Sequence, residues 1–290
     1  MSILSSKAAP RLMSLLLAAA LLLQCGPALA ADEAGRAAPQ DRAAAAAAEM
    51  QRLYGQAPVP FADTDPEFAA VRDRLIYGQI AQRGVLKQDQ RQLVTLVCLA
   101  ALGSESAVAR QAQASLAAGV SPEAVREAVY HVTPYIGMVR AETALSAVNG
   151  VFREKGIALP LADQGTVTEE TRFKDGLALQ SGIFGQRILD MHKNAPEGQK
   201  DIVVDYLSAW CFGDTYTRKV LDIQMRELLT FAAIVSLGGC DGQALGHARG
   251  NLDVGNSQQM LVDALAQCLP YIGFPRTLNG LAAVNKAAAK

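Results

Sequence analysis

The sequence has few aromatic residues and almost no net charge. Phe, Trp and Tyr make up 6% of the 290 residues, and 27 basic side chains against 28 acidic ones leave a formal charge of −1. This balance argues against a protein that coats nucleic acid, and the apolar half of the chain argues against a disordered polymer. Alanine is abundant and no segment alternates apolar and polar residues as sandwich strands do, so we expect an all-α fold.

Beyond the first thirty residues, the chain lacks an apolar run of the about 20 residues that a membrane-spanning helix needs. The thirty residues themselves follow the pattern of a secretory signal: Lys7 and Arg11 precede an apolar run at 12–23, and Ala-Leu-Ala at 28–30 offers a cleavage site. We expect residues 1–30 to be a cleaved signal peptide and the mature protein to be periplasmic or secreted. The alternative is a membrane anchor through a lipid on Cys25, which Gln24 disfavours.

Cysteine is scarce, and its spacing matches neither a disulfide scaffold nor a metal site. Of the four cysteines after residue 30, Cys98 and Cys268 lie in apolar runs, where a buried thiol is expected. The spacing of Glu227, Cys240 and His247 fits no zinc signature, so we expect no metal. Residues 238–242 (GGCDG) lack the Lys-Ser/Thr pair of a phosphate loop and predict a helix break instead.

The chain after residue 60 contains an internal repeat of two similar units. Residues 77–86 (YGQIAQRGVL) recur 135 positions later as 212–221 (FGDTYTRKVL), and 91–93 (RQL) recur as 226–228 (REL). After one inserted residue, PYIG at 134–137 recurs at 270–273. We predict two homologous domains, 61–160 and 170–290, packed as a pseudo-dimer. Residues 31–60, rich in Ala and Pro, are interpreted as a linker or a loosely attached helix.

Each copy has the pattern of a helical unit. Residues 89–102 and 224–237 are apolar on nearly every side, which predicts buried helices that end at Gly103 and Gly238. Ser121 and the Asn256-Ser257 pair are typical starts of the next long helices. The last helices, about 138–153 and 275–288, carry many small residues that allow close packing, and we expect a homo-oligomer.

The second copy resembles the carboxymuconolactone decarboxylase family, which belongs to the same superfamily as the alkylhydroperoxidase D proteins. The resemblance covers residues 172–286 and rests on FGD at 212–214 with Arg218 and Leu221, RELLT at 226–230, LG at 237–238 with His247, and YIGFP at 271–275 with Asn279. The first copy resembles the family more weakly. The resemblance implies compact helical bundles that assemble into trimers or hexamers; a trimer of two-domain chains would satisfy it.

The resemblance also implies a site in the second copy. Family catalysis uses a Glu, a cysteine at the start of the next helix and a His beyond it, which correspond here to Glu227, Cys240 and His247. Cys240 and His247 are seven residues apart and would share one helix face, with Glu227 approaching from the preceding helix. A helix N-terminus favours the thiolate form of a cysteine.

One position departs from the peroxidase pattern. The alkylhydroperoxidase D proteins carry a second cysteine three residues after the first, and here that position is Gln243, so a CxxC disulfide cycle cannot run. A Gln there resembles the decarboxylase branch, which uses no cofactor or metal. Decarboxylation needs a proton donor and a group that holds the anion. We predict His247 as the acid and Gln243, Arg218 or Arg226, Tyr271 and Phe274 as substrate-binding residues.

The first copy is predicted to be a packing partner without catalysis. Gln92 corresponds to Glu227 and Gln111 corresponds to His247, while no cysteine matches Cys240. Neutral amides cannot relay protons. We also assign no role to His131 and His192.

Three functions stay open at this point. The first is a cofactor-independent decarboxylase-like enzyme that acts on a small carboxylated or lactone substrate by acid–base chemistry. The second is a thiol-dependent hydroperoxide reductase that uses Cys240, and the third is a non-catalytic binding or assembly protein. In each case the expected partners are a small molecule and further copies of the chain.

Overall fold

The computed structural model describes residues 41–289. Within that range the secondary structure is helical and contains no strand, which confirms the all-α prediction. The predicted signal segment, Cys25 and the first part of the predicted linker lie outside the described residues. None of the described helices is long and apolar enough to cross a membrane.

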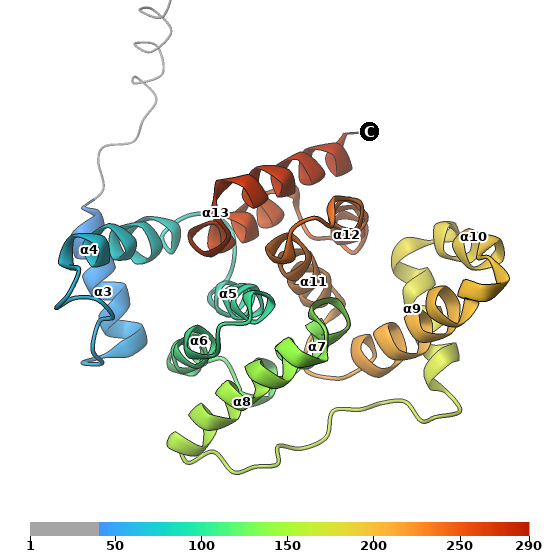
Figure 1. The fold of residues 1–290 in the computed structure, drawn as a ribbon, viewed down its shortest axis with the longest axis horizontal. Coiled ribbons are helices and arrows are strands. Elements are labelled where there is room, and N and C mark those ends of the chain that lie inside the picture. The colour runs from blue at the N-terminus through green and yellow to red at the C-terminus, as the bar shows by residue number, and fades with distance from the viewer. Residues whose placement is uncertain (1–40, 290) are drawn as a thin grey trace, which may run out of the picture. The chain divides into compact units, whose positions relative to one another are not determined.

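Two similar sets of helices follow each other along the chain (Figure 1). The first copy comprises α3 (Arg42–Tyr54), α4 (Pro66–Leu75), η1 (Ile76–Ile80), α5 (Gln88–Leu102), α6 (Glu105–Ala117), α7 (Pro122–Ile136) and α8 (Met138–Glu154). The second comprises α9 (Arg172–Phe184), α10 (Gln186–Asn194), η2 (Glu197–Gln199), η3 (Asp201–Tyr216), α11 (Ile223–Leu237), α12 (Asp241–Asp253) and α13 (Gln258–Ala288).

Helices α5 and α11 form the centre of the molecule, where the two copies meet (Figure 1). All residues at 92–101 in α5 and at 225–236 in α11 are buried, as their nearly continuous apolar sequence predicts. Each helix packs against the other and against helices of both copies. One hydrophobic core therefore spans both copies, and the predicted tandem all-α arrangement is confirmed.

The predicted helix ends are confirmed at the residues that signal them. The hydroxyl oxygens of Ser121 and Ser257 accept hydrogen bonds from the amides of Ala124 and Met260, which caps α7 and α13. Gly103 ends α5 with a φ of 74°, in the left-handed region that glycine adopts without strain. The conformation of Gly273 is not helical and divides α13 into two helices, so that the second begins near the predicted residue 275.

In the structure, the first copy begins earlier in the chain than the start predicted at residue 61. Residues 42–54, assigned to the linker 31–60, form helix α3, which buries Ala46 and Leu53 against the first copy. The same arrangement recurs as α9 against η3. A Cβ on Gly78 would overlap the backbone of Arg42, and a Cβ on Gly213 would overlap the backbone of Arg172. Of the two interpretations given for residues 31–60, a helix is present at 42–54, and it packs against the first copy.

Replacing Gly213 by Ala is expected to destabilise the protein by about 1–3 kcal/mol, because backbone atoms of α9 occupy the space of the new methyl group. The matched control is Gly182→Ala within α9, where nothing lies near the added Cβ; helix propensity should there stabilise the protein by about 0.5–1 kcal/mol. Chemical denaturation measures both changes. Equal effects of the two substitutions would contradict the close approach of α9 and η3.

Candidate active site

A buried carboxylate and a histidine meet in the second copy. Glu227 on α11 is 0% exposed, and its Oε2 lies 3.0 Å from Nδ1 of His247 on α12. The hydroxyl of Tyr216 donates to the other oxygen, Oε1, at 2.8 Å. The rings of Tyr135 and Phe184 pack edge-on against the imidazole, with centroids 5.5 and 5.3 Å away. The predicted pairing of Glu227 with His247 is present in the structure.

The hydrogen bonds around Glu227 form a chain in which each group donates its proton toward the carboxylate. Tyr216 has a single hydroxyl proton, which it gives to Glu227, so the hydroxyls of Tyr135 and Thr230, at 3.0 and 2.9 Å, donate to the oxygen of Tyr216. The thiol of Cys211 in turn donates to Tyr135. Burial raises the pKa of Cys211 to about 12 and raises the pKa of both tyrosines, so these groups stay protonated near neutral pH.

Two residues of this network come from the first copy. Tyr135 and His131 lie on α7, and Nε2 of His131 is 2.9 Å from both the carbonyl oxygen of Arg226 and the hydroxyl of Thr230. Because a carbonyl only accepts, Nε2 carries the proton, and Nδ1 can accept from Arg226. Burial, followed by the charge of Arg226, holds the pKa of His131 well below its usual value, so this ring is neutral. The first copy thus completes the site of the second.

Cys240 does not join the Glu227–His247 pair. It precedes α12 as predicted, but its Sγ lies against the carbonyl oxygen of Gly238 at 3.5 Å, in a small cavity that Arg276 and Asn279 also line. Among the described residues, a hydrogen bond joins the carboxylate to the imidazole, and none joins the thiol to either group. The convergence of all three groups therefore stays a prediction.

The predicted substrate arginines serve the interface between the copies. Arg218 makes two hydrogen bonds to Glu127 of α7, at 2.8 and 3.0 Å, and Glu127 is 0% exposed. Arg226 is 1% exposed, and its guanidinium donates to backbone carbonyls, among them those of Thr215 and Leu221. Burial lowers the pKa of Arg226 to about 10, so it stays charged. All three guanidinium nitrogens of Arg226 and two of those of Arg218 bind protein groups, so a role of either arginine in anchoring a substrate stays a prediction.

The other predicted binding residues, Gln243, Phe274 and Tyr271, lie in three different surroundings. Gln243 is exposed on α12, one turn before His247, and remains a candidate for contact with a substrate. Phe274 is 67% exposed and is no wall of the Glu227–His247 site. Tyr271 lines a cavity of the first copy instead. Its counterpart in the repeat, Tyr135, takes the position predicted for Tyr271.

The first copy likewise takes side chains from the second copy at the corresponding place. In the first copy, Nε2 of Gln111 donates to Oε1 of Gln92 at 2.6 Å, which reproduces the Glu227–His247 contact with two amides. Tyr271 and Gln267 of α13 line that site, as Tyr135 and His131 of α7 belong to the other. Each copy therefore completes its site with a helix of the other copy.

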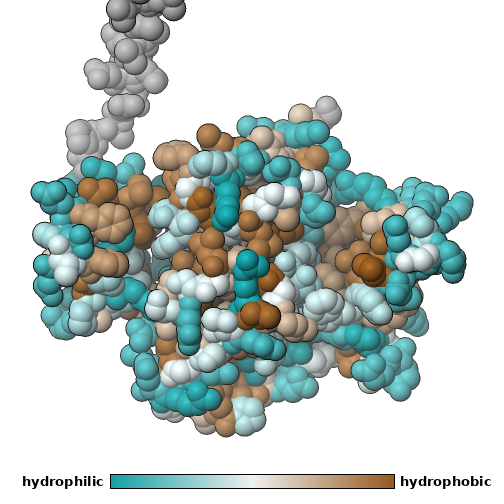
Figure 2. Space-filling model, viewed as in Figure 1, coloured by the Kyte–Doolittle hydropathy of each residue, from teal (hydrophilic) through white to brown (hydrophobic). Residues whose placement is uncertain are grey.

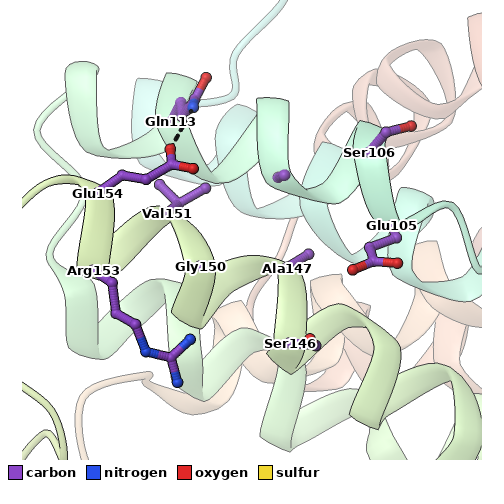
Figure 3. Close-up of a pocket in the computed structure, with 10 residues that line it drawn as sticks. Glu105, Ser106, Gln113, Ser146, Ala147, Gly150, Val151, Arg153 and Glu154 are labelled. Atoms are coloured by element: carbon purple, nitrogen blue, oxygen red, sulfur yellow. Dashed lines mark hydrogen bonds between the residues drawn. The ribbon is translucent and has the colours of Figure 1, made fainter.

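A separate cavity lies between α6 and α8 and has a volume of about 740 Å³ (Figure 3). Its lining includes the polar residues Glu105, Gln113, Arg153 and Glu154, with Gln113 bonded to Glu154, and the small residues Ala147 and Gly150. A similar groove of about 380 Å³ between α12 and α13 occupies the corresponding place in the second copy. Neither groove contains the buried acid–base pair.

The described residues contain no group of three or more His, Cys, Asp or Glu side chains that could hold a metal ion. The groups at Glu227 are a carboxylate with two donors, an imidazole fixed through Nδ1, and aromatic rings beside it. Such a set can move one proton at Nε2 of His247 while Glu227 stabilises the imidazolium.

Comparison with known proteins agrees with this geometry. Residues 66–150 and 203–286 both match the carboxymuconolactone decarboxylase family, which together is more than half of the chain. The chain belongs to the carboxymuconolactone decarboxylase family. It is 29% identical over 96 residues to 4-carboxymuconolactone decarboxylase of Acinetobacter baylyi (strain ATCC 33305 / BD413 / ADP1), an alignment that covers 33% of this chain and 72% of that protein. These matches support a decarboxylase-like or alkylhydroperoxidase D-like function without specifying a substrate.

Sequence reasoning missed Tyr216, Tyr135 and His131. Tyr135 belongs to the repeated PYIG segment, so its recurrence gave a signal, but the repeat could not show which copy's site it enters. His131 has Gln267 as its counterpart and looked like an isolated histidine. The packing of α7 against α11 and η3 brings Tyr135 and His131 to this network.

Removing the carboxylate of Glu127 is expected to destabilise the fold by about 3 kcal/mol, because Arg218 and Arg126 would lose their buried counter-charge. Asp163→Ala is the matched control: Asp163 also faces Arg218, at 3.6 Å, but its side chain is 86% exposed. It should change stability by less than about 0.5 kcal/mol. Denaturant titration of Glu127→Ala and Asp163→Ala decides between an interface role and a loosely held surface pair.

The neutral His131 makes stability depend on pH. Since its pKa is lowered in the folded state, the unfolded chain binds a proton below about pH 6.5 that the folded chain does not, so stability falls as the pH drops. The loss reaches about 1.4 kcal/mol per pH unit. His131→Gln, which installs the residue of the other copy, should reduce this slope between about pH 6.5 and 5, whereas His192→Gln should reduce it much less. An unchanged slope in His131→Gln would contradict the buried neutral ring.

Proposed function

We propose that this protein is a cofactor-independent, decarboxylase-like enzyme that acts on a small carboxylated or lactone substrate at the Glu227–His247 pair. The observation that carries the proposal is the geometry of Glu227, a fully buried carboxylate that holds Nδ1 of His247 at 3.0 Å. A contact of this kind fixes the imidazole and leaves Nε2 as the nitrogen that can exchange a proton with a substrate.

The proposed reaction uses His247 as general acid. When the bond between the carboxylate carbon and the rest of the substrate breaks, CO2 leaves and its bonding electron pair stays on the substrate carbon. The proton on Nε2 of His247 then transfers to that carbon, and solvent restores the proton on the imidazole. Glu227 stabilises the charged imidazolium before the transfer, and Tyr216 and Thr230 keep Glu227 oriented.

The walls of the site suit an apolar or planar substrate body. Phe184 comes from α9 and Tyr135 from α7, so the imidazole lies between two rings from different copies. Between these rings the side chain of His247 is 13% exposed. Gln243, one turn away on the exposed side of α12, is proposed to bind a polar substrate group.

A thiol peroxidase is the second candidate. Its support is that Cys240 is the least buried of the four described cysteines and lies at the start of α12. Cys240 makes no hydrogen bond to His247 or Glu227 among the described residues, which speaks against a mechanism in which His247 is the base for this thiol. Cys211, closer to Glu227, is a buried thiol with a raised pKa and does not fill that role.

We also propose where the enzyme acts and through which surfaces it assembles. From the pattern of residues 1–30 we propose that the enzyme acts in the periplasm or outside the cell, on a small acid that reaches that compartment. The grooves of small residues between α6 and α8 and between α12 and α13 are proposed as contact surfaces of a homo-oligomer.

Release of CO2 from 4-carboxymuconolactone and from a panel of small lactone acids tests the proposal. His247→Gln and Glu227→Gln should each lower kcat/KM by about 10²- to 10⁴-fold, because proton transfer is lost. The double variant carries the Gln–Gln pair that the first copy already contains, so it should remain folded. Circular dichroism and thermal unfolding supply that check.

Cys240→Ser is the discriminating variant. The acid–base mechanism expects its decarboxylase rate to stay within about twofold of the wild type, since the mechanism gives the thiol no role in proton transfer. A thiol peroxidase would instead lose all turnover of an organic hydroperoxide in Cys240→Ser and would form a trappable sulfenic acid in the wild type. Full activity in the folded Glu227→Gln, His247→Gln double variant would overturn the proposal.

A further inference from the structure

The first copy contains a cavity that the proposed reaction does not use. It has a volume of about 300 Å³, at the lower end of the range for small-molecule sites. It lies beside the Gln92–Gln111 pair, since Gln111 lines it together with Tyr271 of the second copy. Its other chemistry-bearing wall residues are Tyr54, Tyr77, Arg72 and Arg110.

Arg110 brings a positive charge to this cavity without an acidic partner among the described residues. Its guanidinium stacks on the ring of Tyr54, 3.9 Å from the centroid, interacts with the hydroxyl of Tyr54, and donates a long hydrogen bond of 3.4 Å to the carbonyl oxygen of Pro58. By contrast, Arg83 and Arg218 at the copy interface pair with Asp263 and Glu127. A stacked guanidinium with unused donors fits the two oxygens of a carboxylate.

The tyrosines give the cavity aromatic and uncharged walls. The hydroxyls of Tyr54 and Tyr77 lie 3.1 Å apart with their rings edge to face, and Tyr271 closes the wall from α13. Burial raises the pKa of Tyr54 and Tyr271, so neither carries a negative charge that would repel an anion. Aromatic walls of this kind favour a flat ring between them.

The two arginines are particular to the first copy. The repeat places Gly246 where the first copy has Arg110, and Leu207 where it has Arg72. At the same time His247 is replaced by Gln111, which removes the proton donor. The first copy has therefore lost the groups that transfer a proton while it has cations that the second copy lacks at these positions.

The loop before α4 closes one side of the cavity, and the same arginines hold it. Arg72 donates to the carbonyl oxygen of Pro60 at 3.1 Å, and Phe61, which follows, has a φ of 65°. A left-handed phenylalanine is strained and persists only where its surroundings fix it. Phe61, Phe68 and Val71 are each more than half exposed, and Figure 2 shows apolar surface at this α3–α4 end of the molecule.

We propose that the cavity of the first copy is a binding site for a small monocarboxylate that carries a flat ring, and that it binds this ligand without converting it. The carboxylate pairs with Arg110, the ring lies among the tyrosines, and Gln111 offers a polar contact. The site is separate from the Glu227–His247 pair and does not depend on the reaction proposed there.

Isothermal titration with benzoate tests this site in the full chain. Benzoate is expected to bind one site per chain, and benzamide, which has the same ring without the charge, at least about tenfold more weakly. Arg110→Gln should weaken benzoate binding by at least about tenfold. Arg74→Gln is the matched control, because it removes one exposed arginine of α4 outside the cavity and should leave the affinity unchanged.

The double variant Glu227→Gln, His247→Gln locates the ligand. Unchanged benzoate binding in this variant supports the site in the first copy, whereas lost binding places benzoate at the Glu227–His247 pair and overturns the proposal. Absence of binding by the wild type up to about 10 mM benzoate also overturns it, as does equal affinity in wild type and folded Arg110→Gln. Thermal unfolding of each variant confirms that the fold is retained.

Discussion

The structure depends on buried polar groups that pair across the boundary between the two copies. Glu127 of α7 neutralises Arg218, Arg226 caps several carbonyls beside His131, and Tyr135 donates to Tyr216. Each of these groups would be costly to bury without its partner. The apolar core formed by α5 and α11 brings the copies together, while this network fixes how α7 lies against the second copy.

The same arrangement explains why the two sites diverged without loss of the fold. A carboxylate with an imidazole and an amide with an amide both satisfy two facing side chains, at 3.0 Å in one copy and 2.6 Å in the other. Only the first pair can hold and release a proton. Each site also borrows a tyrosine from the other copy, so the copy without a proton donor remains necessary for the copy that has one.

The sequence predicted the helices well because its signals are local. Ser121, Gly103 and the apolar runs of α5 and α11 specify caps and burial within a few residues. The resemblance to the family correctly paired Glu227 with His247. The sequence could not show that Arg218 and Arg226 are engaged at the interface, or that Tyr135 replaces Tyr271, because the two halves of a repeat look alike until packing assigns them. The alanine-rich α3 carried too weak an apolar pattern to be recognised as part of the first copy.

The central claim is that a tyrosine of the first copy supports acid–base chemistry in the second. The most direct measurement compares kcat/KM for CO2 release in Tyr135→Phe and Tyr271→Phe, two equivalent positions of the repeat. The account predicts a clear loss of rate in Tyr135→Phe, because the hydrogen-bonded chain to Glu227 is broken, and a rate close to wild type in Tyr271→Phe. The opposite result, or equal losses in both folded variants, would contradict it.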